Sequence, residues 1–151
     1  MTKTKEETNS ECQENGDIVL LEYIPLGRIK SILRLTEQDE TVLTHLEESE
    51  AYTLRYRLIY DILHELTQAL LLCDCIKSRN HYCLFAKLCV TYPEFDWNFF
   101  EVLRKKRNGI AYYGEEVSQK DLDEIYATIT KYMKILREET ERRIKELEKR
   151  I

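Results

Sequence analysis

A short basic stretch, residues 104–114, holds the side chains best suited to chemistry in this chain. Four of its first five residues are basic, although the chain as a whole carries a net charge of −5. Arg107 stays charged at physiological pH and can direct two donors onto one phosphate, and Asn108 can donate to a phosphate oxygen or orient Arg107. We therefore predict a phosphate-binding site at Arg107, shared with its basic neighbours Arg104, Lys105 and Lys106.

Tyr112 extends this candidate site. It follows Arg107 by five residues, about 140° around an ideal helix, so the two share a face only where the helix ends or bends. Gly109 and Gly114 allow such an end. The alternative interpretation is structural, since a basic helix end also complements the helix dipole and binds acidic neighbours.

Three of the ten tyrosines, Tyr52, Tyr56 and Tyr60, recur every four residues. This spacing places them on one side of a helix. A packing stripe whose hydroxyls reach the surface is the favoured interpretation. A surface on which bases stack is the alternative.

The cysteines form no pattern typical of a metal centre, because no C-x-x-C pair occurs. A zinc site would need four soft ligands to converge, whereas Cys73 and Cys89 lie on apolar stripes. We therefore expect no metal and no cofactor. In a reducing compartment we expect the thiols to stay unpaired. The five cysteines are Cys12, Cys73, Cys75, Cys83 and Cys89.

The bulk composition restricts the function. A net charge of −5 argues against a protein that coats nucleic acid non-specifically. No apolar run approaches a membrane span and the N-terminus lacks the apolar core of a secretory signal, so we expect a cytoplasmic protein without a membrane partner. Mixed charges on 34% of residues indicate helices with many ion pairs and favour, weakly, a thermophilic source.

The N-terminal half is predicted to pass from a tail into helices. Residues 1–17 are polar and are predicted to be a disordered tail. Residues 18–24 are apolar but too short to assign. A helical pattern begins near Leu26, and Thr36 followed by Asp39 predicts a new helix start.

The strongest helical pattern runs from Leu58 to Cys73, with apolar residues three and four positions apart. After it, a short helix ends at Pro93, and a helix opened by Asp96 carries the basic stretch. Ser118 then starts a last helix that is about 45–50 Å long. The prediction is an all-α, largely antiparallel bundle of four or five helices, forming a single domain over residues 18–151.

Two segments resemble the HEPN family (higher eukaryotes and prokaryotes nucleotide-binding), and the resemblance covers about residues 28–140. Residues 69–81 are similar to the family's apolar helix end, short link and histidine opening the next helix. Residues 103–112 resemble its R-x(4–6)-H signature, with Arg107 as the arginine and Asn108 as its polar follower. Tyr112 stands where the family has histidine, as in one branch of HEPN proteins.

The resemblance implies a homodimer that binds RNA or a nucleotide in a cleft at the dimer interface. Active members cleave RNA without a metal, and Arg107, Asn108 and Tyr112 would form the catalytic set. Arginine can stabilise the pentacovalent phosphate while a proton acceptor assists the 2′-hydroxyl. Because a phenol titrates near pH 10, Tyr112 is a poorer base than histidine, so attenuated activity is expected.

The resemblance also implies partners. HEPN toxins of toxin–antitoxin pairs are often encoded beside a nucleotidyltransferase antitoxin that modifies a tyrosine near the motif. Tyr113 or Tyr112 would be the target, although Gly114 occupies the usual tyrosine position. Glu65 is a candidate to meet Arg107 inside the bundle. The alternative function is a non-catalytic helical interaction module that pairs with a nucleotidyltransferase or another partner.

Overall fold

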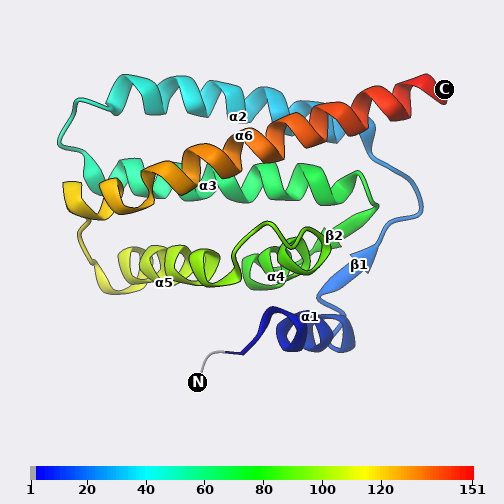
Figure 1. Cartoon of the computed structure of the whole chain (residues 1–151), viewed down its shortest axis with the longest axis horizontal. Coiled ribbons are helices and arrows are strands. Elements are labelled where there is room, and N and C mark those ends of the chain that lie inside the picture. Colours follow the sequence, from blue (N-terminus) through cyan, green and yellow to red (C-terminus); the bar gives the residue numbers. More distant parts are fainter. Residues whose placement is uncertain (1–2) are drawn as a thin grey trace.

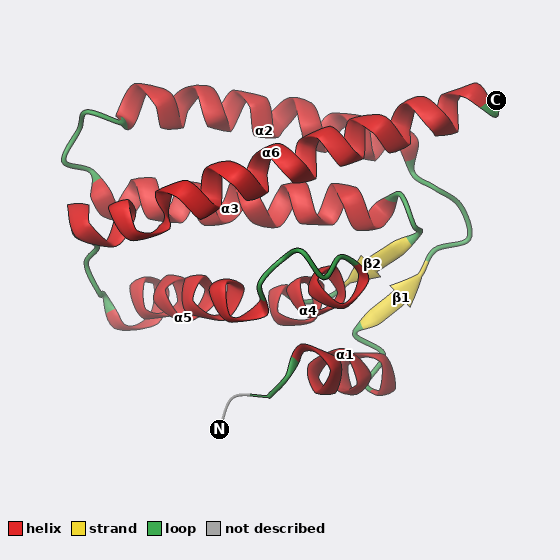
Figure 2. Cartoon of the chain, in the orientation of Figure 1, coloured by secondary structure: helices red, strands yellow, loops and turns green. Residues whose placement is uncertain are grey.

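The computed structural model describes residues 3–151, which form six helices and two short strands (Figures 1 and 2). Consecutive helices run antiparallel in the pairs α2–α3 and α5–α6, which confirms the predicted helical bundle with a long last helix. The number of helices within residues 3–151 is six and not four or five, because α1 forms within the predicted tail. The elements are α1 Lys5–Glu14, β1 Ile18–Leu20, α2 Leu26–Leu46, α3 Tyr52–Leu72, β2 Ile76–Ser78, α4 His81–Thr91, α5 Trp97–Tyr113 and α6 Gln119–Lys149.

The core is built around α3. Leu70, Leu71 and Leu72 are fully buried although they point to different sides of the helix, so the end of α3 is surrounded by protein. In Figure 1, α2 and α6 lie along α3, and α4 and α5 lie below it. Each fully buried leucine contributes about 1.5–3 kcal/mol through its removal from water.

The predicted helix start at Thr36 is wrong, because α2 is continuous from Leu26 to Leu46. Thr36 is buried, and its hydroxyl donates to the Leu33 carbonyl at 2.8 Å instead of capping a new helix. The same hydroxyl accepts from Arg137 of α6 at 3.0 Å. A threonine with these partners fits a helix interior, so the sequence signal was misleading here.

Residues 3–20 form an ordered N-terminal arm, not the predicted disordered tail; Met1 and Thr2 lie outside the described residues. The arm comprises α1 and β1, and β1 pairs antiparallel with β2. Helix α1 has only three buried residues, Thr8, Asn9 and Cys12, and no apolar stripe. Its attachment to the bundle therefore depends on specific links.

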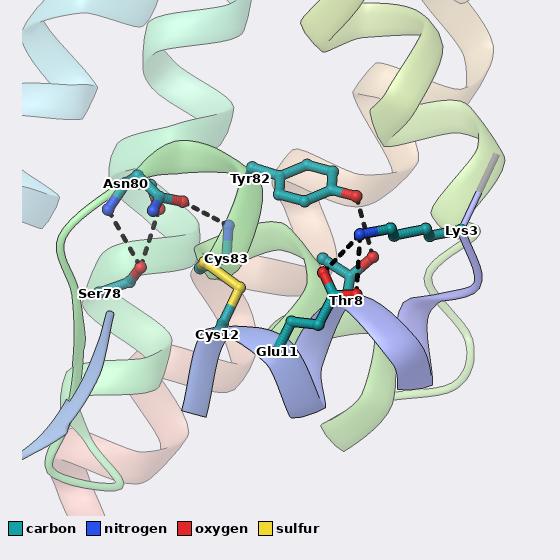
Figure 3. The surroundings of a disulfide bond; sticks show 8 residues. All are labelled: Lys3, Thr8, Glu11, Cys12, Ser78, Asn80, Tyr82 and Cys83. Atoms are coloured by element: carbon teal, nitrogen blue, oxygen red, sulfur yellow. Dashed lines mark hydrogen bonds and ion pairs between the residues drawn. A yellow bond between two sulfur atoms is a disulfide. The ribbon is translucent and has the colours of Figure 1, made fainter. Parts of the chain in front are cut away.

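A disulfide between Cys12 and Cys83 is the strongest of these links (Figure 3). The expectation that all five cysteines are unpaired thiols is therefore wrong for this pair, because the fold brings together two residues 71 positions apart. Cys73, Cys75 and Cys89 are free. Burial raises the pKa of Cys73 to about 11 and that of Cys89 to about 12, so both stay protonated.

Hydrogen bonds add to the attachment of the arm. The Thr8 and Tyr82 hydroxyls share a hydrogen bond of 3.0 Å, also drawn in Figure 3. Lys5 donates to the Cys89 carbonyl at 3.2 Å, and the Trp97 indole donates to the Lys3 carbonyl at 3.0 Å. The arm is thus connected to α4 and to the start of α5.

The ends of α5 and α6 agree with the sequence signals. Asp96 caps α5 by accepting the Asn98 N–H at 3.0 Å. Gly114 ends α5 with a φ of +64°, a left-handed conformation that favours glycine. Ser118 and Asp121 form a capping box at the start of α6.

The end of α6 packs on its own chain. Thr140 and Ile144 are buried, and Arg143 pairs with Asp74 at 2.6 Å. These contacts attach the second half of α6 to the rest of the bundle. No helix within residues 3–151 is both long and apolar enough to cross a membrane.

Candidate functional site

The basic stretch does not act as one patch, because each residue of α5 is rotated by about 100° from the last. Arg104 and Arg107 are three positions apart and line the same cavity. Lys105 is exposed and lies outside that cavity. The predicted phosphate-binding residues are therefore separated, because Arg104 and Arg107 line the cavity and Lys105 does not.

Lys106 supports the turn between α5 and α6. Its ammonium group lies 3.8 Å from both Glu115 and Asp121, and it donates to the Glu116 carbonyl at 3.4 Å. These partners match the structural interpretation of a basic helix end, in which side chains bind acidic neighbours. Lys106 is accordingly a structural residue in this arrangement.

The cavity that receives Arg104 and Arg107 has a volume of about 270 Å³ and lies between α3, α4 and α5. It brings together four of the residues predicted from the sequence with four that were not assigned to the site. The predicted residues are Arg104, Arg107, Asn108 and Tyr112, and the additional ones are Tyr60, Asn80, His81 and Tyr82. We call this cavity the arginine cleft.

Arg104 is already neutralised within the cleft. Its guanidinium donates twice to the buried carboxylate of Glu101, at 3.0 and 3.2 Å, and lies 4.6 Å from the centre of the Tyr82 ring. The hydrogen bonds to Glu101 raise the pKa of Arg104. Arg104 is therefore held in place, and its charge is largely compensated.

Arg107 differs from Arg104, since it forms no salt bridge or side-chain hydrogen bond within residues 3–151. Its guanidinium lies over the ring of the buried Tyr60, 5.5 Å from the ring centre. This cation–π contact positions the group without using its N–H donors. Those donors remain available for an anionic ligand.

His81 faces the same cleft from the first residue of α4. Asn80 fixes this position by capping the helix, since its side chain accepts the Cys83 N–H at 2.7 Å. The His81 Nδ1 atom shares a hydrogen bond of 3.1 Å with the Tyr60 hydroxyl, and the ring stacks on His64 with 3.7 Å between ring centres. The imidazole is therefore held by the start of α4 and by two residues of α3.

Electrostatics keep this histidine neutral. Burial, with further contributions from His64 and Arg107, lowers the pKa of His81 to about 4. Burial raises the pKa of Tyr60 to about 12, so its hydroxyl remains protonated. At neutral pH the cleft thus contains one guanidinium without a salt-bridge partner among the described residues, that of Arg107, beside an uncharged imidazole.

The structure places Glu65 against His64, with 3.7 Å between Oε1 and Nδ1, and within residues 3–151 no ion pair joins Glu65 to Arg107. The contact with His64 lowers the pKa of Glu65. The carboxylate that responds to Arg107 is Asp61. Burial raises the pKa of Asp61, and the positive charge of Arg107 lowers it again in part. The suggested meeting of Glu65 with Arg107 is therefore wrong.

Glu65 opens instead onto a neighbouring cavity of about 500 Å³, also lined by Asp61, His64 and His81. His64 was not among the site residues predicted from the sequence. A signal was present, because Tyr60, Asp61, His64 and Glu65 recur at positions that share one side of a helix.

The tyrosines predicted from the sequence to matter differ in burial. Tyr56 and Tyr60 are buried, which confirms packing for these two and excludes them as a stacking surface, whereas Tyr52 is half-buried. The expectation that the hydroxyls reach the surface is wrong for Tyr60, which has no exposed surface. Tyr112 lies at the rim of the arginine cleft and is 73% exposed, while Tyr113 is 83% exposed and lies outside the cleft. An enzyme could therefore reach the Tyr113 hydroxyl.

Within the described part of the chain, no group of three or more His, Cys, Asp or Glu residues is arranged to hold a metal ion. Comparison with protein-family models, curated proteins and solved structures finds no match to this chain. The likeness of residues 69–81 and 103–112 to HEPN segments therefore remains a prediction. The geometry of the arginine cleft is therefore the main structural indication of function.

Proposed function

We propose that the arginine cleft binds a phosphate group of RNA or of a nucleotide. The observation that carries this proposal is the guanidinium of Arg107, which forms no salt bridge or side-chain hydrogen bond within residues 3–151, beside the neutral imidazole of His81. Arginine N–H groups match the geometry of phosphate oxygens, and a neutral imidazole can donate or accept a proton. A cavity of about 270 Å³ suits a phosphate and part of a sugar better than a whole nucleotide.

The wider proposal is a HEPN-type homodimer in which the cleft lies at the interface of the two copies. Two features support it: a histidine opens α4, and α5 directs an arginine toward it. In a toxin-type ribonuclease the 2′-hydroxyl attacks phosphorus and loses its proton while the P–O5′ bond breaks. The products are a 2′,3′-cyclic phosphate and a 5′-hydroxyl, which takes up a proton.

Activity in this scheme needs a base, and Tyr112 is poorly suited to that role because it is an exposed phenol. His81 is the better proton acceptor, because a neutral imidazole accepts a proton more readily than a neutral phenol, and its pKa of about 4 makes it a weaker base than a free imidazole. We therefore place Arg107 on the phosphate, Asn108 beside it and His81 near the reacting hydroxyl.

Binding of a fluorescent single-stranded RNA tests the phosphate site. We expect Arg107→Ala to weaken binding by about tenfold or more, because it removes two donors and a charge. Lys105→Ala is the matched control, since Lys105 lies on the same helix outside the cleft, and we expect a change within about twofold. Equal losses in the two variants would refute the site.

Cleavage of the same RNA tests the enzymatic part separately. The ribonuclease proposal is supported if the wild type cleaves the RNA and neither Arg107→Ala nor His81→Ala does. Equal cleavage by wild type and Arg107→Ala, or none by either, would remove the ribonuclease claim. Tyr112→His is the complementary variant, with increased cleavage expected if position 112 is a degraded catalytic position.

A non-catalytic interaction module is the second candidate function. The observation in its favour is the exposure of Tyr113, whose hydroxyl a nucleotidyltransferase partner could modify. Coexpression with such an enzyme should add a nucleotide mass to the wild type and not to Tyr113→Phe. Modification of both proteins, or of neither, would exclude this role for Tyr113.

We propose that the protein is cytoplasmic, and the Cys12–Cys83 disulfide has to be reconciled with that location. Disulfides are rare in reducing cytosol, but intracellular proteins of hyperthermophiles are a known exception. A charged fraction of 34% agrees with such a source. A thiol assay on protein extracted under acid quenching decides whether the bond exists in cells.

A further inference from the structure

A second concave region lies on the opposite side of α3 from the arginine cleft. Figure 1 shows α2 and α6 drawing apart toward the start of α3. A groove of about 420 Å³ opens there, lined by residues of all three helices. Its apolar wall is formed by Leu43, Ile59, Ile129 and Met133.

Arg55 gives this groove a cationic group without a partner. Its Nε and Nη1 atoms are buried and form no hydrogen bond within residues 3–151. The guanidinium lies 6.0 Å from the centre of the Tyr52 ring. A buried guanidinium nitrogen without an acceptor is unfavourable, and an anion beside Arg55 would supply that acceptor.

The position of Arg55 in α3 strengthens this argument. It lies in the first turn of the helix, where the dipole already favours negative charge, and the cap residue Ala51 provides no side-chain hydrogen bond. A cation at this end is unfavourable unless an anion approaches it. An anionic ligand would therefore gain from both Arg55 and the helix end.

The other charges of the groove leave room for one negative charge. Arg137 is neutralised by Glu40 at 3.0 Å and Glu37 at 3.5 Å. Arg55 and Lys134 then face a single remaining carboxylate, Glu47. Counting only the residues that line the groove, three cations (Arg55, Lys134 and Arg137) face two carboxylates (Glu40 and Glu47), a balance of one positive charge beside an apolar wall. Glu37, which also pairs with Arg137, lies outside the lining.

We propose that the groove between α2, α3 and α6 binds a small amphiphilic carboxylate, with the carboxylate at Arg55 and the apolar chain against Ile59, Ile129 and Met133. Its size is within the range of small-molecule sites, which are mostly apolar with a few converging polar groups. The inference does not depend on the phosphate site, because the two regions share no lining residue.

Calorimetric titration with decanoate below its micelle-forming concentration tests the proposal, with 1-decanol as the uncharged probe. We expect saturable binding of decanoate that is tighter than binding of decanol. Arg55→Met should weaken decanoate binding by about tenfold or more and remove its advantage over decanol. The same variant should raise the melting temperature of the free protein, because an unpartnered buried cation is gone.

Two further variants keep the test sharp. Arg57→Met changes an exposed arginine of α3 outside the groove, and its decanoate affinity should stay within about twofold of wild type. Thr130→Trp fills the groove mouth from an exposed position and should abolish binding. Absent or non-saturable binding, or unchanged binding by Arg55→Met, would overturn the proposal. If the wild type is a dimer and Thr130→Trp dissociates it, the groove is an interface with a second copy. That result would also overturn the proposal.

Discussion

The helical body around α3 and the N-terminal arm, residues 3–20, are held by different kinds of interaction. The body buries apolar side chains along whole helices, as at Leu63, Leu66 and Leu70, which have no exposed surface. The arm has no apolar stripe, and it is attached by one disulfide, a few hydrogen bonds and a strand pair of three residues. The body is therefore stabilised by distributed burial and the arm by a small number of links.

The arginine cleft is lined by the helical body alone, but it lies next to the attachment point of the arm. Tyr60 and Arg107 come from α3 and α5, and His81 and Tyr82 come from the first turn of α4. Cys83 of the same turn carries the disulfide to the arm, and Tyr82 bonds to Thr8 of α1. The different stabilities of the two regions consequently bear on the site.

The largest effect is expected in the body. Leu66→Ala should lower the free energy of unfolding by about 3–5 kcal/mol, since it leaves a cavity next to α3. Leu35→Ala is the control, because Leu35 is 52% exposed and should change stability by about 0.5 kcal/mol or less. Urea unfolding measures both, and similar losses would contradict the central position of α3.

Removal of the disulfide should have the next largest effect. Cys12→Ser with Cys83→Ser should cost about 2–4 kcal/mol, because the bond closes a long loop in the unfolded chain. Hydrogen exchange should show lost protection in α1 while α3 stays protected. Unchanged protection of α1 would mean that the arm does not depend on the disulfide.

A pH effect tests the junction between the two regions. Because the pKa of His81 is lowered to about 4 in the folded protein, the unfolded chain binds more protons below its ordinary value of 6.5. Stability should therefore fall as the pH drops from 6.5 toward 4, by about 1–2 kcal/mol for this partly exposed group.

Denaturant unfolding at several pH values measures this dependence. His81→Gln should flatten it, and His45→Gln, which alters an exposed histidine of α2, should not. The same pH dependence in wild type and His81→Gln would show that His81 is not the group responsible.

The smallest effects are expected at two glycines, where alanine substitutions should change stability in opposite directions. Gly114→Ala should lower stability by about 1 kcal/mol, since its φ of +64° is unfavourable for a side chain. Gly27→Ala should raise stability by about 0.4–1 kcal/mol, because it lies in α2 with open space around it. Thermal unfolding with calorimetry compares them, and changes of equal sign would contradict the assigned end of α5.

The contrast between body and arm also explains what the sequence could predict. Helices α3, α5 and α6 follow from periodic apolar residues and from the end signals Asp96, Gly114 and Ser118. Helix α1 could not be predicted in this way, because its order arises from contacts such as Cys12–Cys83 between distant residues.

The site shows the same division. Its arginine and amide follow from local sequence, and the separation of Lys105 from Arg107 follows from helical rotation alone. The pairing of His81 with His64 and Tyr60 could not be predicted, because it requires the packing of α4 on α3.

The imidazole signals in an NMR titration with adenosine 5′-monophosphate test the central claim, phosphate binding in the arginine cleft, most directly. The chain has three histidines, so each can be followed. We predict saturable shifts of His81 and its stacking partner His64, no shift of His45, and loss of the response in Arg107→Ala. Equal shifts of all three histidines, or an undiminished response in Arg107→Ala, would contradict the claim.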